Sequence, residues 1–550
     1  MIRIVKKYWP EISIFGLIAL IMLIDLSPGI TWVNTDSDGA HYILAAKYFT
    51  TAHNLSAPLY LIWSHFMLLL PFGSEAWRMG LTSALSTIIA SILVYLIIRA
   101  ILKDNPKSRI SGLFGALVYG GSALVISQST IIETYALSTM LGLAAYYFSL
   151  KKRWIATSIM LGLCVPVHIL LALFVWAVLF FQNKSMRAWK PFIITSSFAL
   201  FYLYLPIVGK YGTTPTMWNN TSLTSVFSGT MGVVTMLTGG ISIWDLPKRI
   251  LDTIGILGVS LGIAIIPLTY HFIKVKKWRY HLLWLFVIPI FYFVIDLAAE
   301  TYVYMIVAVA YGSIAAGIGI SYFKKQYILA MFVTALLLTG FNANYFDIGR
   351  TLDKDMSAMM FYKELDKIPD GQIFLGGGWN WAMVGLYNKE QNRKIIPVST
   401  DMLSSKKYRD ILDSENIKYT LPNTKSLITL EGEMSVSIAE LNNGVWIAKE
   451  TKPEVYQYVV EPAKDNKTYL TRWIGEDIQP TWRFKPSNPY LYITGALEVK
   501  EWNHILWSNK NANMFIGIGV IIYCLYTLAL RQYDKRRINE NTFIQKEKRA

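Results

Sequence analysis

The sequence predicts a polytopic α-helical membrane protein of about twelve crossings, with a non-cytoplasmic α/β domain inserted before the last helix. Three observations support this fold class. The 550 residues are 53% hydrophobic and 14% aromatic, which is too apolar for an ordinary soluble chain of this length. Apolar runs of roughly 20 residues, long enough to cross a bilayer, recur along the chain. The stretch 347–510, by contrast, is polar and has dispersed charges.

The formal net charge of +16 is explained by membrane topology and not by nucleic acid. Most clustered Lys and Arg residues fall in short connections between apolar segments, as they do in cytoplasmic loops of membrane proteins. The two cysteines, Cys164 and Cys524, lie far apart in apolar segments. Neither a disulfide framework nor a zinc site is therefore indicated.

Candidate membrane spans are distributed over nearly the whole chain. The first apolar run follows Lys6 and Lys7 like the core of a signal peptide, but no small-residue cleavage pattern follows it. We predict that it is retained as the first helix. Spans are predicted near 11–30, 76–102, 110–129, 131–150, 190–209, 253–273, 281–299, 301–322, 327–346 and 513–531.

Two further apolar stretches are ambiguous, and the basic residues resolve both. The run 56–72 is short and bounded by prolines, whereas 154–181 is too long for one crossing and is interrupted at Pro166 and His168. If the first lies along the outer surface and the second forms two short helices, every basic cluster falls on the cytoplasmic side. Both termini are then inside. The segments placed outside are 31–75, 128–135, 210–252 and 347–510.

The polar segment 347–510 is predicted to be α/β. A strand over 372–375 is followed by Gly376-Gly377-Gly378 and a helix over 379–387, then by a strand over 394–398 and a helix over 404–414. The glycines lack the spacing of phosphate-binding loops, so we interpret them as a strand-to-helix turn. The predicted organisation is a transmembrane domain (1–346), an extracytoplasmic α/β domain (347–510), a final transmembrane helix (511–531) and a basic cytoplasmic tail (532–550).

Acidic residues gather on the predicted outer side. The first outer loop contains Asp36, Asp38 and His41 directly after the first crossing. A carboxylate there can act as general base toward an attacking hydroxyl, or can cap a surface helix that begins near Ala40, and the two interpretations are compatible. Glu133 lies in a very short connection, where an ionisable group is costly and usually functional, although an interfacial acid is the plain alternative.

Other outer residues could bind a substrate. His168 lies at the apex of the predicted helix pair, where a histidine is either structural or part of the same site. Arg78 could stabilise a phosphate or anchor a helix end. Aromatic and amide side chains suit sugar binding and an interfacial belt equally. These candidates are Tyr135, Trp218, Asn219, Asn220, Glu300 and Tyr302, with Tyr304 beside the last of them. Although carboxylates suit magnesium or manganese, we predict no metal and no cofactor.

The order and spacing of these motifs resemble the GT-C superfamily of polytopic glycosyltransferases, most closely its transmembrane O-mannosyltransferase-like branch. Two departures stand out: the family's Asp-Ser-Gly-Glu is here Asp-Ser-Asp-Gly, and Asn220 stands where an acid is common. The resemblance is carried by Asp36-Ser37-Asp38-Gly39, Pro58-Leu59-Tyr60, Leu69-Leu70-Pro71-Phe72-Gly73, Glu133-Thr134-Tyr135-Ala136-Leu137, Gly162-Leu163 with His168, Trp218-Asn219-Asn220, and Ile368-Pro369-Asp370-Gly371.

The resemblance implies inverting transfer of a sugar, with a mannose-like hexose favoured. The donor would be a polyprenyl-phosphate sugar, and the acceptor a hydroxyl on a protein, lipid or glycan at the outer face. The membrane would be the plasma membrane of a prokaryote, or the endoplasmic reticulum of a eukaryote. Asp36 would deprotonate the acceptor, and Asp38 and Glu133 would orient it or stabilise positive charge at the anomeric carbon. His168 and Arg78 would hold the donor phosphate, and the substrate-binding candidates include His41.

Three other classes of function stay open at this point. A transporter or lipid-linked glycan flippase would place charged sites near the bilayer midplane, whereas the acids here lie at predicted outer helix ends. A glycan ligase or polymerase would share the donor but need not share the early Asp motif. A scaffold or sensor, with 347–510 as its binding module, would leave Asp36, Glu133 and His168 unexplained.

Overall fold

The computed structural model describes most of the first 463 residues. It divides the chain into two units, and the first, Met1–Ala496, contains every described residue. The described residues are 2–30, 38–50, 52, 57–182, 186, 189–203, 246–274, 279–295, 303–345, 357–376, 380–400, 403, 406–423, 427–442, 444–452 and 457–463. The predicted last span and basic tail lie outside these residues.

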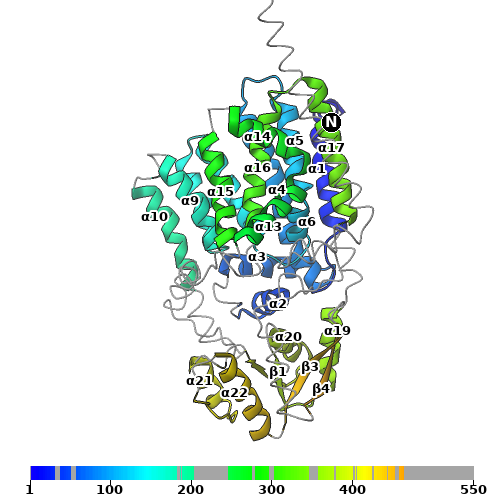
Figure 1. The fold of residues 1–550 in the computed structure, drawn as a ribbon, viewed down its shortest axis with the longest axis vertical. Helices are drawn as coiled ribbons and strands as arrows, with labels where there is room; N and C mark the ends of the chain where they lie inside the picture. The colour runs from blue at the N-terminus through cyan, green and yellow to red at the C-terminus, as the bar shows by residue number, and fades with distance from the viewer. Residues whose placement is uncertain are drawn as a thin grey trace, which may run out of the picture. The chain divides into compact units, whose positions relative to one another are not determined.

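Apolar helices dominate the first 345 residues, as expected of an integral membrane protein (Figure 1). Within the described ranges, three segments are long and apolar enough to cross a membrane: Lys7–Ile24, Glu75–Ile101 and Ile250–Lys274. The bent pair α5 and α6 makes a fourth if it is one broken span. The helices are α1 (Ile2–Ile24), α4 (Glu75–Ile101), α5 (Ser108–Gly120), α6 (Ala123–Ser129), α7 (Tyr135–Leu150), α8 (Trp154–Cys164), α9 (Ile169–Gln182), α10 (Trp189–Ser197), α13 (Leu246–Leu261), α14 (Ile265–Lys274), α15 (Arg279–Ile295), α16 (Met305–Ile320) and α17 (Lys325–Tyr345), with short 3₁₀ segments η2 (Phe198–Leu203) and η4 (Gly262–Ala264). The predicted number of crossings, about twelve, stays a prediction.

The single span predicted over 110–129 is broken. α5 and α6 meet at an angle of 62°. Gly121 lies at the break, where the Asn342 side chain of α17 donates a hydrogen bond of 2.7 Å to its carbonyl oxygen. A side chain that supplies this bond compensates for the interruption of the helical ladder, which periodicity in the sequence cannot reveal.

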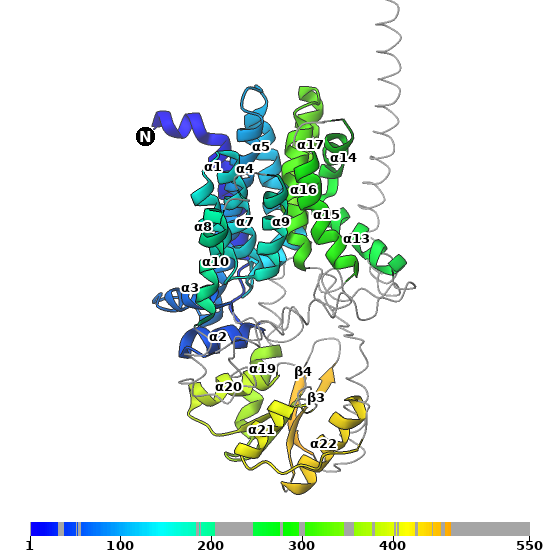
Figure 2. The same ribbon diagram turned by 90° about the vertical axis from the view of Figure 1, so that its left-hand side faces the viewer.

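Both ambiguous stretches have the predicted form. The run 154–181 forms the short helices α8 and α9, separated at Pro166 and His168. The run 56–72 contains α3 (Pro58–Leu68), which begins at a proline, as is common at a first helical position. Figures 1 and 2 show α3 and α2 (Asp38–Tyr48) lying across the ends of the long helices and not alongside them.

One face of α3 is buried and the other exposes large apolar side chains. Tyr60, Leu61 and Ser64 are buried, whereas Trp63 and Phe66 are 47% and 61% exposed. A helix that lies across spanning helices and turns aromatic side chains outward has the character of a helix in the membrane interface.

The α/β part has a four-stranded sheet in the order β2-β1-β3-β4. β1 (Ile373–Gly376) pairs in parallel with β2 (Ile396–Ser399) and β3 (Trp446–Lys452), and β4 (Gln457–Pro462) is antiparallel to β3. The four elements predicted between 372 and 414 are present as β1, α20, β2 and α21, with ends shifted by a few residues. Its helices are α19 (Ser357–Glu364), α20 (Asn380–Gln391), α21 (Lys406–Ser414) and α22 (Leu427–Leu441), with the short η6 (Leu365–Lys367).

One continuous apolar core joins α2, α3, the turn after α6, and α20. Leu44, Tyr60, Ile132 and Leu386 are all buried in it. A Cβ placed on Gly385 of α20 would lie 3.4 Å from Leu44 Cδ2 of α2, an ordinary van der Waals contact. Because each fully buried apolar side chain contributes about 1.5–3 kcal/mol, this core fastens α20 to α2. Figure 2 shows α2 between the long helices and α20.

Gly319 of α16 allows α14 to approach to backbone contact. A Cβ at this position would lie 1.9 Å from the carbonyl oxygen of Pro267. Because small residues set the closest approach of membrane helices, Gly319→Ala should destabilise the protein by about 1–3 kcal/mol, seen as a lower Tm in detergent. Gly258→Ala is the matched control, since no described atom lies within 4 Å of a Cβ there. Equal Tm values for the two variants would contradict this packing argument.

Candidate active site

The structure describes some of the predicted site residues and not others. His41, Glu133, Tyr135 and His168 belong to described segments, as does Arg78. α2 begins at Asp38, two residues before the helix start expected from the sequence. Outside the described residues lie Asp36, Trp218, Asn219, Asn220, Glu300 and Tyr302, so their roles remain predictions.

The end of α1, the start of α2 and the turn after α6 are packed together. The backbone amide of Ser27 donates to the carbonyl oxygen of Thr130 over 2.8 Å. A Cβ on Gly39 would lie 3.4 Å from Ile132 Cδ1 and 3.5 Å from Ile30 Cγ2. Asp38 precedes Gly39 and Glu133 follows Ile132. The first turn of α2, which begins at Asp38, is therefore next to the turn that carries Glu133.

Glu133 is almost completely buried, at 2% exposure. Its backbone carbonyl accepts a 2.9 Å hydrogen bond from Ser83 Oγ of α4, and the Thr134 amide donates to its Oε2 over 3.3 Å. Burying a carboxylate is expensive and is most often tolerated where the group has a function. The buried carboxylate of Glu133, in the turn after α6 and bonded through its backbone to Ser83 of α4, is the strongest single indication of a site.

The first turn of α3 brings the predicted site segments together. The Leu59 amide donates to the carbonyl oxygen of Pro166, at the apex between α8 and α9, over 3.2 Å. The next residue, Tyr60, packs edge-on against Tyr42 of α2, with ring centroids 5.1 Å apart. Burial raises the pKa of Tyr60, and the negative charge of Glu133 raises it further. α2, the Glu133 turn and the His168 apex thus converge on α3.

Tyr60 is a candidate site residue that sequence reasoning missed. It is fully buried, and it is distinguished from other buried tyrosines by the negative charge of Glu133, which acts on its hydroxyl. The signal that could have found it is the Pro58-Leu59-Tyr60 motif, which sequence analysis used only for the resemblance.

Aromatic rings surround His168. Its ring centroid lies 5.4 Å from that of Tyr135 and 5.3 Å from that of Tyr304, and the two tyrosine rings are 5.7 Å apart. Tyr292 of α15 extends the group, 5.2 Å from Tyr304. Tyr304, which the sequence offered beside Tyr302, is the described tyrosine of this segment and lies against His168. Apolar ring faces beside an imidazole and phenol hydroxyls can stack on a sugar and hydrogen-bond a phosphate.

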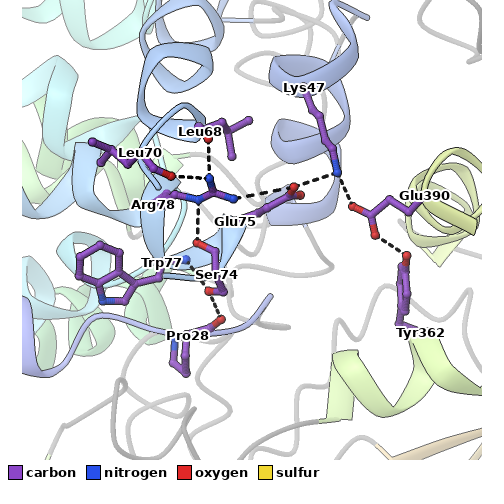
Figure 3. Close-up of polar contacts among 10 residues, drawn as sticks. All are labelled: Pro28, Lys47, Leu68, Leu70, Ser74, Glu75, Trp77, Arg78, Tyr362 and Glu390. Carbon is purple, nitrogen blue, oxygen red and sulfur yellow. Dashed lines mark hydrogen bonds and ion pairs between the residues drawn. The ribbon is translucent and has the colours of Figure 1, made fainter. Parts of the chain in front are cut away.

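Of the other predicted substrate-binding residues, Arg78 is bonded to the end of a helix and His41 is buried. The Arg78 Nη1 atom donates to the carbonyl oxygens of Leu68 and Leu70 over 2.5 and 2.7 Å, so the guanidinium caps the end of α3 (Figure 3). This geometry favours the helix-end anchor over the phosphate contact. His41 is 1% exposed on α2. Within the described ranges no group of three or more His, Cys, Asp or Glu residues is arranged to hold a metal ion.

Comparison with known proteins adds a family and a fold. Residues 38–189, somewhat over a quarter of the chain, match the family described as protein O-mannosyl-transferase TMEM260 N-terminal domain. That range includes α2, α3, Tyr60, Glu133 and His168. Among curated protein sequences no match was found.

A solved structure shares the fold at low sequence identity. ArnT from Cupriavidus metallidurans bound to undecaprenyl phosphate aligns with a TM-score of 0.51 and 12% identity over 74% of this chain and 88% of its own. The apo form of ArnT gives 0.48 at 12% identity over 80% and 93%. The Archaeoglobus fulgidus oligosaccharyltransferase with Zn and sulfate gives 0.45 at 11% identity over 74% and 67%. The resemblance predicted from the motifs is confirmed by the match of residues 38–189 to a protein O-mannosyltransferase family and by the fold shared with ArnT.

Proposed function

We propose that this protein transfers a sugar, a mannose-like hexose being favoured, from a polyprenyl-phosphate donor to an acceptor hydroxyl at the outer face of the membrane. The observation that carries the proposal is the buried Glu133 at the junction of α2, α3 and the His168 apex. ArnT has been solved with undecaprenyl phosphate, which supports a polyprenyl-phosphate donor. The description of the matched family supports mannose and a protein acceptor.

The proposed reaction is a single inverting displacement. Asp36 accepts the proton of the acceptor hydroxyl as its oxygen attacks the anomeric carbon. The bond from that carbon to the phosphate oxygen breaks, and the polyprenyl phosphate leaves with the bonding electron pair. Asp38 orients the acceptor, and the buried charge of Glu133 stabilises the positive character that develops at the anomeric carbon.

The aromatic side chains around His168 bind the sugar phosphate of the donor, and the membrane holds its polyprenyl chain. The rings of Tyr135 and Tyr304 offer apolar faces to the sugar, and His168 between them is placed to hydrogen-bond the phosphate. The outward aromatic side chains of α3 hold the site at the level of the lipid headgroups. We place the protein in the plasma membrane of a prokaryote as a multi-pass protein, or in the endoplasmic reticulum of a eukaryote.

The direct test is sugar transfer by the purified protein. The protein in detergent is given polyprenyl-phosphate donors that carry radiolabelled mannose or glucose, together with serine- and threonine-containing peptides or a lipid acceptor. We expect label to move from the mannose donor to a hydroxyl of one acceptor with inversion at the anomeric carbon. The absence of transfer from every donor, in preparations that bind the donor lipid, would contradict the proposal.

Tyr60→Phe should lower kcat about tenfold or more with little change in the KM for the donor. The variant keeps the ring that packs on Tyr42 and removes only the hydroxyl beside Glu133. One hydrogen bond to a charged group in the transition state is worth an effect of this size. The matched control is Tyr146→Phe, which removes another buried hydroxyl with no partner among the described residues, on α7 against Tyr311. Equal kcat values for the two variants would show that Tyr60 has no special role.

A further inference from the structure

One lysine joins three segments that are far apart in the sequence. Lys47 lies in the last turn of α2, and its Nζ atom is 2.8 Å from Glu75 Oε1 and 2.9 Å from Glu390 Oε1. Glu75 is the first residue of α4, and Glu390 lies near the end of α20. Figure 3 shows the ammonium group between the two carboxylates. α2 is thus bonded to the membrane helices on one side and to the α/β part on the other.

The contacts continue beyond both carboxylates. The other oxygen of Glu390 accepts a hydrogen bond from the Tyr362 hydroxyl of α19. On the far side, Arg78 Nη2 lies 4.0 Å from Glu75 and the same guanidinium binds the carbonyl of Leu68. A connected series of polar contacts therefore runs from the end of α3 through α4 and α2 to α20 and α19, as Figure 3 shows.

The Lys47 bridge, formed by the ion pairs of Lys47 with Glu75 and Glu390, persists over the physiological pH range. Burial by itself lowers the pKa of Lys47, but the hydrogen bonds and charges of Glu75 and Glu390 outweigh it and raise the pKa above its usual value. A raised lysine pKa means that the stabilisation is fully present at pH values below the ordinary lysine pKa. It is lost only as the pH rises through the still higher folded-state pKa.

α2 connects this bridge to the turn that carries Glu133. It is an 11-residue helix that begins at Asp38, and Lys47 is its tenth residue. At 1.5 Å per residue the helix is about 16 Å long, so tilting it at the Lys47 end displaces its first turn, where Gly39 lies against Ile132, next to Glu133. A displacement of about 1 Å at a reacting group can lower a rate about a hundredfold.

We propose that Lys47 is a positioning residue through which the α/β part, by way of Glu390, holds the first turn of α2 against the Glu133 turn for catalysis. The inference rests on the proposed function of Glu133. It assigns to α20 and α19 a role in the reaction that the family match, which ends at residue 189, does not cover. The apolar contact between Leu44 and Gly385 holds the same two helices together and sets the position about which α2 can tilt.

The test compares Lys47→Met, Lys47→Arg, Glu390→Gln and Lys367→Met in the full-length protein. Lys367→Met is the matched control, because Lys367 forms an exposed pair with Glu364 within the same α/β part and does not reach α2. We expect Lys47→Met and Glu390→Gln to lower kcat about 10- to 100-fold with an unchanged KM for the donor. Lys47→Arg should restore most of the loss, and Lys367→Met should match the wild type.

Hydrogen exchange of the 38–48 amides supplies a second measurement that does not depend on activity. Faster exchange there in Lys47→Met and Glu390→Gln, but not in Lys367→Met, is the expected result. Wild-type kcat and wild-type exchange in Lys47→Met would overturn the inference, as would an effect of Lys47→Met that Glu390→Gln does not share. A wild-type protein that transfers no sugar would instead contradict the proposed function, and the exchange measurement would still decide whether Lys47 holds α2.

Discussion

Asp36→Asn should lower the rate of sugar transfer by about 10²–10⁴-fold, the usual contribution of a general base. The amide has the size of the carboxylate but cannot accept the proton of the acceptor hydroxyl. Asp36 lies two residues before the start of α2, and Gly39 in the first turn of that helix contacts Ile132, next to Glu133. The base proposed at Asp36 is thus two residues in sequence from a helix whose first turn lies against the Glu133 turn. Single-turnover transfer from a labelled polyprenyl-phosphate donor measures the loss.

Asp104→Asn is the control for a general effect of removing an acid. Asp104 is exposed in the connection between α4 and α5. This variant should transfer sugar at the wild-type rate, and both variants should melt at the wild-type temperature. If Asp36→Asn retained full activity in the same membranes, Asp36 would not be the base.

Glu133→Gln should lower kcat by about 10²–10³-fold, the effect of losing one well-placed electrostatic group. The substitution leaves the hydrogen bond from Ser83 to the backbone carbonyl intact and removes the negative charge that acts on Tyr60. Because a neutral amide is cheaper to bury than a carboxylate, the variant should melt at the wild-type temperature or above it. Loss of activity without loss of stability would identify an acid kept for function.

Glu11→Gln should behave in the opposite way. Glu11 of α1 is also buried, but its carboxylate accepts hydrogen bonds from Arg109 Nε over 2.8 Å and from the Tyr95 hydroxyl over 2.7 Å. An amide would turn an N–H group toward the guanidinium, so this variant should melt at a lower temperature with an unchanged kcat per folded molecule. If Glu133→Gln lowered stability and kept kcat, as predicted for Glu11→Gln, Glu133 would be structural.

The sequence by itself determined the class of the protein, the local form of its segments and the family resemblance. Hydropathy and prolines marked 154–181 and 56–72 as ambiguous, and the basic clusters predicted that the first is two helices and that the second is a separate surface segment, which is α3 in the structure. The form of such segments is predictable because it depends on neighbouring residues. Strand and helix periodicities placed β1 and α20 correctly for the same reason. Motifs within the range 38–189 were enough to recognise the family.

Only the tertiary structure decided which of these segments meet. The bond between Lys47 and Glu390 joins residues 343 positions apart, and neither periodicity nor motif spacing specifies such a pair. The same holds for the effect of Glu133 on Tyr60 and for the contact of Tyr304 with His168. Local sequence patterns determine which face of a helix is apolar, but the packing of whole helices determines which residues that face contacts. The acids proposed to carry the chemistry were therefore visible in the sequence, whereas the contacts of Tyr60 and Lys47, which are proposed to support them, emerged only from the fold.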